Sequence, residues 1–126
     1  MYLIIDLSVD NTIQLALFSL SDRRETIVLA RNTQLLFCIK KFLDEQGLSF
    51  SDLRGVAVVV GEGGFTSTRL SVVIGNMIAF TCGIPILAVT AVEAREKQRM
   101  IERLLEQPFQ YYIIPTYSAA PRVMQP

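Results

Sequence analysis

The stretch from Val56 to Val89 constrains the fold of this chain more than any other. It begins with a short β-branched run, 56–60, passes through a glycine-rich loop, 61–64, and continues as an apolar helix to about Cys82. It ends in a second apolar run, Ile86–Val89. Apolar strands on either side of a crossover helix form a parallel pair, so we predict an α/β fold with at least part of its sheet parallel.

The ends of this helix carry recognisable signals. Gly61, Gly63 and Gly64 allow the chain to turn sharply after the first strand, and Thr66 or Ser67 is expected to cap the helix N-terminus. Gly83 is expected to stop the helix before the Ile84-Pro85 entry to the next strand. The segment is therefore a strand-loop-helix-strand unit.

The helix itself is apolar on every side. It carries no charge from Leu70 to Phe80, so another part of the protein or a partner has to cover each of its sides. Ser71, Gly75 and Ala79 are spaced at i, i+4 and i+8 and form a ridge of small residues. We expect this ridge to let another helix approach closely.

A membrane-spanning helix is the alternative interpretation of this segment. No charge occurs from Leu70 through Val92, a length that would suffice to cross a bilayer. Gly83 and Pro85 interrupt the segment, however, and its second half is β-branched. The pattern therefore favours a buried helix followed by a buried strand, with no membrane partner.

The remaining elements complete a single lobe. We predict an antiparallel meander of three strands, at Tyr2–Leu7, Ile13–Leu20 and Thr26–Ala30. Two further helices are predicted at Thr33–Gln46 and Ala91–Gln107. A short strand or extended segment follows at Tyr111–Ile114, and a tail at 115–126. The order β-β-β-α-β-α-β-α is that of the ribonuclease H-like fold and of one lobe of the actin-like ATPases. We therefore expect one lobe over residues 1–114 and an extended tail over 115–126.

Composition restricts the function classes. Hydrophobic residues make up 51% of the 126 residues, more than a core of this size needs, which indicates a protein interface. Twelve basic residues balance twelve acidic ones, so direct binding of nucleic acid is not expected. The chain has no histidine, which excludes histidine-dependent nucleophilic catalysis and imidazole metal sites.

Cysteine usage indicates the compartment. Cys38 and Cys82 are expected to be free, buried thiols, which fits a reducing cytoplasm. The N-terminus, Met-Tyr-Leu-Ile-Ile-Asp, shows no charged leader, so no secretory signal is expected.

A few side chains could carry chemistry. Asp6 ends the first strand, where this fold class places a metal-binding carboxylate, and Glu62 follows the central strand. The pair could hold a metal for phosphodiester cleavage, although we expect both to be turn or capping residues. The glycine loop could hold a phosphate, but it lacks the lysine of a P-loop. Arg69 could bind an anion or pair with Glu62 or Asp6.

Two motifs resemble a known family. Gly61-Glu62-Gly63-Gly64-Phe65-Thr66-Ser67-Thr68-Arg69 and the run 83–94, Gly-Ile-Pro-Ile-Leu-Ala-Val-Thr-Ala-Val-Glu-Ala, resemble TsaB (YeaZ), a subunit of the bacterial machinery that makes threonylcarbamoyladenosine at A37 of tRNA. The matching loop residues are Gly61, Gly63, Phe65, Thr66 and Arg69, and Glu93 matches in the second motif. Shorter matches are Ile5–Ser8, Gln34–Leu36 and, in the tail, Pro115–Tyr117 and Pro121–Val123.

The sequence also departs from the family pattern. Glu62 stands where the family has proline, Gly64 where it has serine, and Ser67 and Ser71 where it has glycines. The family's second lobe has no counterpart, since the residues after Glu96 lead almost directly into the tail-like motif. Because actin-like proteins bind nucleotide between two lobes, we expect no cofactor for this chain alone.

The resemblance implies a non-catalytic scaffold subunit. Such a subunit pairs through two helices of its first lobe with the catalytic subunit TsaD or with a second copy of itself. By position the helices are 33–46 and 69–82, and the expected contact residues are Leu35, Phe37, Cys38, Phe42, Leu70, Ser71, Ile74, Gly75, Ile78 and Ala79. Two alternatives stay open: a metal-dependent ribonuclease H-like nuclease that uses Asp6 and Glu62, and a divergent self-associating paralogue with another role.

Overall fold

A five-stranded mixed sheet forms the centre of the protein. The computed structural model describes residues 1–61 and 65–106, the latter range without the side chains of residues 65, 66, 97, 98, 105 and 106. The strands are β1 (Tyr2–Asp6), β2 (Thr12–Phe18), β3 (Arg23–Leu29), β4 (Gly55–Val59) and β5 (Ile86–Val89), and the helices are α1 (Leu35–Glu45), α2 (Phe65–Cys82) and α3 (Lys97–Glu106). Short 3-10 helices lie at Asn32–Gln34, Phe50–Asp52 and Glu93–Arg95.

The sheet has the order β3-β2-β1-β4-β5. The first three strands pair antiparallel, whereas β4 runs parallel to both β1 and β5. Every residue of β4 is buried, as expected of a central strand between helices on both faces. The predicted α/β class and element order of a ribonuclease H-like lobe are confirmed.

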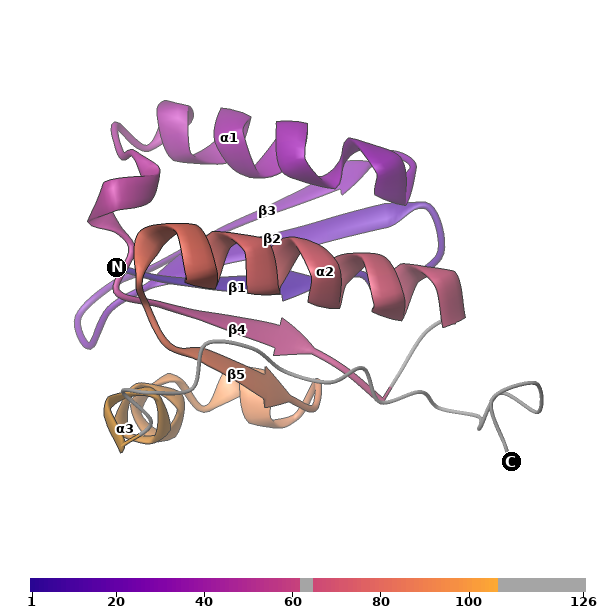
Figure 1. Ribbon diagram of the computed structural model, residues 1–126. Helices are drawn as coiled ribbons and strands as arrows, with labels where there is room; N and C mark the ends of the chain where they lie inside the picture. The colour runs from indigo at the N-terminus through magenta and orange to yellow at the C-terminus, as the bar shows by residue number, and fades with distance from the viewer. Residues whose placement is uncertain (62–64, 107–126) are drawn as a thin grey trace.

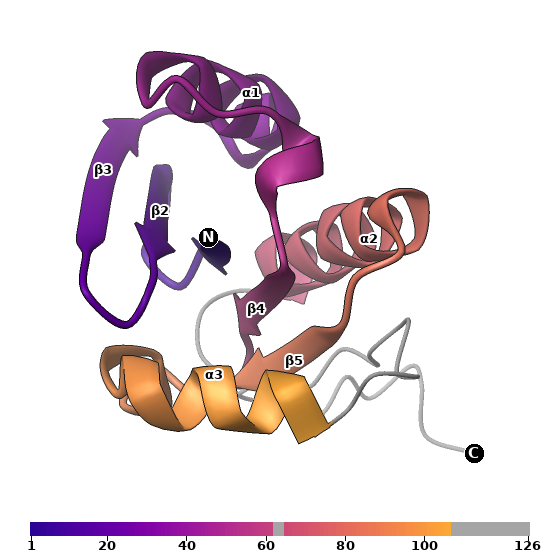
Figure 2. The ribbon, with the colours of Figure 1, turned by 90° about the vertical axis from the view of Figure 1, so that its left-hand side faces the viewer.

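Helices cover the two faces of the sheet unequally. Figure 1 and Figure 2 show α1 and α2 side by side on one face and α3 on the other. The larger core cluster includes Ile39 and Leu43 of α1, and the smaller one includes Met100 and Leu104 of α3. The face of the sheet that carries α1 and α2 therefore has the larger hydrophobic core.

Glycines end the two helices of that layer. Gly47, after α1, and Gly83, after α2, have φ of 72° and 66°, a left-handed conformation that side chains disfavour. The amide of Ile84 donates to the carbonyl of Ala79 at 3.0 Å and closes the last turn of α2. The predicted stop at Gly83 is confirmed, and Gly47 ends α1, which was predicted to run to Gln46, in the same way.

Three predicted boundaries are wrong. The second hairpin turns earlier, with the Ser19 amide donating to the Asp22 carbonyl at 2.8 Å, so β3 starts at Arg23 and Leu20 is 67% exposed in the turn. The last helix does not run unbroken from Ala91, because Glu96 has a non-helical backbone (φ −98°, ψ 73°) between the 3-10 helix and α3. The helix α2 begins at Phe65, so Thr66 and Ser67 lie inside it and do not cap it.

Other predictions have mixed outcomes. Cys38 is buried and free, but Cys82 is free and only half-buried. Within residues 1–61 and 65–106, no helix has the length and hydropathy needed to cross a bilayer. The predicted strand or extended segment at 111–114 and the tail at 115–126 lie outside the described residues, so the proposed division at residue 114 stays a prediction.

Candidate interaction surface

The small residues of α2 face the sheet. Ser71 is 1% exposed, Ala79 is fully buried and Gly75 is buried. A Cβ atom added to Gly75 would lie 2.6 Å from Cγ2 of Val58 and 3.1 Å from Cδ1 of Ile86. The expectation that this ridge admits a helix of another subunit is therefore wrong, because β4 and β5 already occupy the space beside it.

Most of the other predicted contact residues are also in the core. Leu35, Cys38, Phe42 and Ile78 are 7% exposed or less, and Leu70 and Ile74 are half-buried. Among the predicted set Phe37 is the one large side chain that is mostly exposed, at 65%. The set predicted from sequence thus mixes residues that hold the helices to the sheet with a few that a partner could reach.

The outer side of α2 carries an apolar stripe instead. Val73, Met77 and Phe80 are 59%, 42% and 78% exposed, and their spacing of four and three residues places them on one side of the helix. On α1, Leu36 and Phe37 are 42% and 65% exposed. We call these five side chains the α1–α2 face.

Sequence reasoning missed four members of the α1–α2 face. A signal for the three on α2 was present, because Val73, Met77 and Phe80 lie on the side of the helix opposite Ser71, Gly75 and Ala79. Small residues let a helix approach a sheet closely, which leaves the large side chains on the opposite side of the helix. The size pattern therefore distinguishes the two sides of a helix that is apolar all round.

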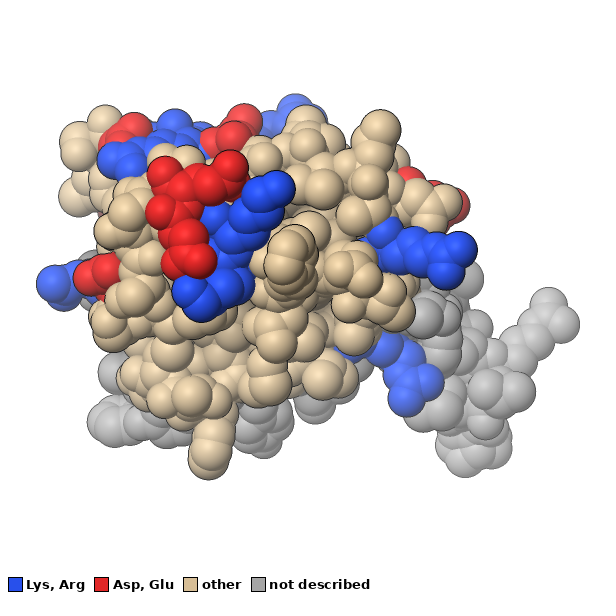
Figure 3. Space-filling model, turned by 90° about the horizontal axis from the view of Figure 1, so that it is seen from above, with Lys and Arg blue, Asp and Glu red and all other residues tan. Residues whose placement is uncertain are grey.

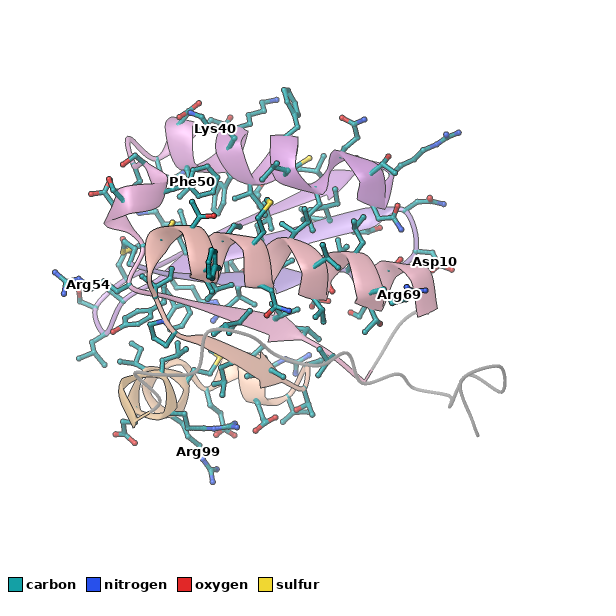
Figure 4. All side chains as sticks on the ribbon, in the orientation of Figure 1. Asp10, Lys40, Phe50, Arg54, Arg69 and Arg99 are labelled. Atoms are coloured by element: carbon teal, nitrogen blue, oxygen red, sulfur yellow. The ribbon has the colours of Figure 1, made fainter. Side chains whose placement is uncertain are left out.

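Charged residues lie beside the apolar part of this surface. In Figure 3, which looks down on the side of α1 and α2, acidic and basic side chains gather next to a wide region without charge. Lys40, on the outer side of α1 in Figure 4, pairs with Asp44 at 2.7 Å. A shallow hollow beside Phe37 is lined by Lys40, Lys41, Asp44 and Glu45. An apolar centre with a charged rim is the usual anatomy of a protein interface.

The carboxylate at the end of β1 is engaged in a local turn. One Asp6 oxygen, Oδ1, accepts hydrogen bonds from the Ser8 amide at 2.9 Å and the Ser8 hydroxyl at 2.6 Å. This contact confirms the turn role predicted for Asp6. Glu62 lies outside the described residues, and the described residues contain no group of three Cys, Asp or Glu side chains placed to hold a metal.

The glycine loop is described only at its ends. Gly61 has a φ of 83°, which fits the predicted sharp turn, and Gly63 lies outside the described residues. Phe65 and Thr66 form the first residues of α2, and Arg69 is exposed on the same helix. Figure 4 shows Arg69 at the end of the lobe where α2 begins.

The first turn of α2 is joined to the segment before α1. The side-chain amide of Asn32 donates to the Ser67 hydroxyl at 3.2 Å. This contact links the starts of the two helices that carry the α1–α2 face. It therefore helps to fix their relative position.

Glu93 holds the turn between β5 and α3. Its carboxylate accepts from the Thr90 amide at 2.9 Å, and the Glu93 amide donates to the Thr90 hydroxyl at 3.2 Å, as in a capping box. The second carboxylate oxygen accepts from Arg103 of α3 at 2.6 Å. The hydrogen bond from the Thr90 amide lowers the pKa of Glu93. Desolvation acts in the opposite direction, and the charge of Arg103 lowers the pKa further.

This arrangement predicts a pH dependence. Because the pKa of Glu93 is lower in the folded chain than its ordinary 4.5, its stabilisation is present above pH 4.5 and is lost as the pH falls below it. We expect Glu93→Gln to reduce the free energy of unfolding at pH 7 by roughly 0.5–1 kcal/mol, a modest effect because the site is partly exposed. Urea unfolding from pH 7 to 3 should show the difference from wild type shrinking with acid. Glu102→Gln, on the exposed side of α3, is the control, and an equal loss in both variants would contradict the assignment.

Comparisons with known proteins agree with this architecture. The family model described as TsaD, tRNA N6-adenosine threonylcarbamoyltransferase, matches residues 29–120, more than half of the chain. No curated protein matches the chain at a significant level.

Two solved structures are similar to the lobe. One is YeaZ from Pseudomonas aeruginosa, with a TM-score of 0.64 and 26% identity over 71% of this chain and 44% of that chain. The other is an uncharacterized protein with similarity to peptidase YEAZ, from Pseudomonas aeruginosa, with a TM-score of 0.66 and 26% identity over 78% of this chain and 47% of that chain. The chain thus spans less than half the length of either structure.

Proposed function

Because the chain belongs to the family of TsaD, tRNA N6-adenosine threonylcarbamoyltransferase, and resembles YeaZ, we propose that it is a scaffold subunit for threonylcarbamoyl modification of tRNA. In this proposal the modified position is A37 and the reaction takes place in the cytoplasm. The chain itself does not contact the tRNA. Its role is to bind a TsaD-like catalytic subunit or a second copy of itself. The observation that carries the proposal is the α1–α2 face.

The α1–α2 face supports pairing for a physical reason. Five large apolar side chains are exposed on two neighbouring helices, and α2 contributes no charge after Arg69. Removing such a side chain from water contributes about 1.5–3 kcal/mol when burial is complete. Two helices from each partner would bury this surface as a helical bundle.

The proposal gives the chain no active site of its own. Asp6 is already engaged by Ser8, and the sequence contains no histidine that could act as a general base near neutral pH. No observation favours the nuclease alternative. The residues that carry the proposed role are therefore those of the α1–α2 face.

Competition with a full-length YeaZ subunit tests this role. We expect the purified chain, added in large molar excess, to slow threonylcarbamoyl transfer by a reconstituted TsaD–YeaZ pair, because it occupies the same face of TsaD. The measurement is the rate of modified tRNA formation, with Phe80→Asp as a matched variant that should not compete. If the rate is unchanged and the chain is a dimer, it pairs only with a second copy of itself. If the rate is unchanged and the chain is a monomer, the proposal is contradicted.

A further inference from the structure

Met77 lies in the middle of the apolar stripe on α2. It is 42% exposed and lies four residues after Val73 and three before Phe80, so its thioether is on the outer side of the helix. Met1 is half-buried and Met100 is 1% exposed, while Met124 lies outside the described residues. Among the described methionines Met77 is thus the most exposed residue.

The two cysteines are less accessible to an oxidant than Met77 is. Peroxide reacts with the thiolate form of cysteine, whereas methionine needs no ionisation. Cys38 is only 7% exposed, and burial raises the pKa of the half-buried Cys82 thiol, so little thiolate is present at neutral pH. The exposed thioether is therefore the more accessible target on this side of the protein.

We propose that Met77 is a site of reversible oxidation that controls pairing through the α1–α2 face, an inference that rests on the proposed function. Hydrogen peroxide transfers one oxygen atom to the sulfur: the O–O bond breaks, an S–O bond forms, the sulfur is oxidised by two electrons and the peroxide is reduced to water. The product is a polar sulfoxide between Val73 and Phe80, which reduction by a thiol-dependent reductase reverses.

The sulfoxide opposes pairing because of where it lies. Pairing would move the Met77 side chain from water into an apolar contact, where the sulfoxide oxygen has no donor on its own stripe. The same geometry works in the other direction, because a paired chain covers the sulfur and slows its oxidation. Oxidation and pairing are therefore expected to exclude each other.

The test uses the Cys82→Ser chain, so that oxidation of the more exposed of the two thiols does not contribute. The chain is treated with hydrogen peroxide, the sulfoxide is located by peptide mass mapping, and the dissociation constant of the self-pair or of the pair with TsaD is measured by sedimentation. We expect oxidation at Met77 to weaken pairing by about tenfold or more, since burial of one unsatisfied polar group has an effect of that size. Met77→Leu, which keeps volume and polarity, should pair normally and resist the treatment.

The outcomes are distinguishable. An unoxidised chain that does not pair refutes the proposed function and this inference together. A chain that pairs equally well with and without the sulfoxide at Met77 refutes this inference alone. Loss of pairing in oxidised Met77→Leu, or the absence of a sulfoxide at Met77 when free methionine in the same solution is oxidised, also overturns it.

Discussion

Gly75→Leu is expected to destabilise the fold strongly instead of producing a fully stable monomer that cannot pair. Even a single Cβ at this position would lie 2.6 Å from Val58, and a leucine adds three further carbons against the central strand β4. Overpacking of this kind costs about 3 kcal/mol or more, a large share of the roughly 5–15 kcal/mol that stabilises a typical domain. Urea unfolding followed by circular dichroism measures the loss.

Two variants on the same helix serve as references for Gly75→Leu. Val73→Leu enlarges a side chain that is 59% exposed, so the unfolding midpoint should stay that of the wild type. The unfolding midpoint of Gly75→Ala should lie between those of Gly75→Leu and the wild type. Its gain in helix propensity of about 1 kcal/mol only partly offsets the close contact of the new Cβ with Val58. A Gly75→Leu chain as stable as the wild type would show that α2 does not pack this closely on β4.

Phe80→Asp is expected to abolish pairing while it leaves the fold intact. Phe80 is 78% exposed, so its replacement removes almost no core contact. In a pair, however, the carboxylate would be buried in an apolar contact with Val73 and Met77 as neighbours on the stripe. We expect the dissociation constant to rise at least about 100-fold, a loss typical of a central interface residue. Light scattering gives the mass and circular dichroism checks the fold.

Leu29→Asp is the matched control for Phe80→Asp. Leu29 is 85% exposed on the edge strand β3 and follows Val28, which packs against the core cluster of α1, so its side chain is on the other face of the sheet. The same charge there should leave pairing unchanged. Equal losses of pairing in the two variants would point to a general effect of added charge. Normal pairing by Phe80→Asp would remove Phe80 from the interface.

The order of elements along the chain could be predicted because its signals are local. The two helix stops at Gly47 and Gly83 follow from the left-handed conformation that glycine adopts readily. The strand β4 is recognisable because it is apolar on both faces, as a parallel central strand has to be. These features depend on a few neighbouring residues, so sequence alone specifies them.

The orientation of α2 could not be predicted from hydrophobicity. From Leu70 to Phe80 the helix has no polar side, so its pattern does not show which side faces the core. The ridge at Gly75 is, from sequence alone, equally compatible with contact to another helix. The structure shows that residue size settles the question, since Gly75 meets Val58 and Phe80 points outward. The break at Glu96 was also missed, because the helical pattern of charges continues through it.

The solution mass of the wild-type chain, alone and after mixing with TsaD from the same source, tests the central claim most directly. If the α1–α2 face is a pairing surface, light scattering should give twice the chain mass alone, or the mass of a one-to-one complex with TsaD. A dimer that converts to that complex would identify TsaD as the partner, and a dimer that ignores TsaD would favour the self-associating paralogue. A chain that stays monomeric at high concentration and in the presence of TsaD would contradict the account.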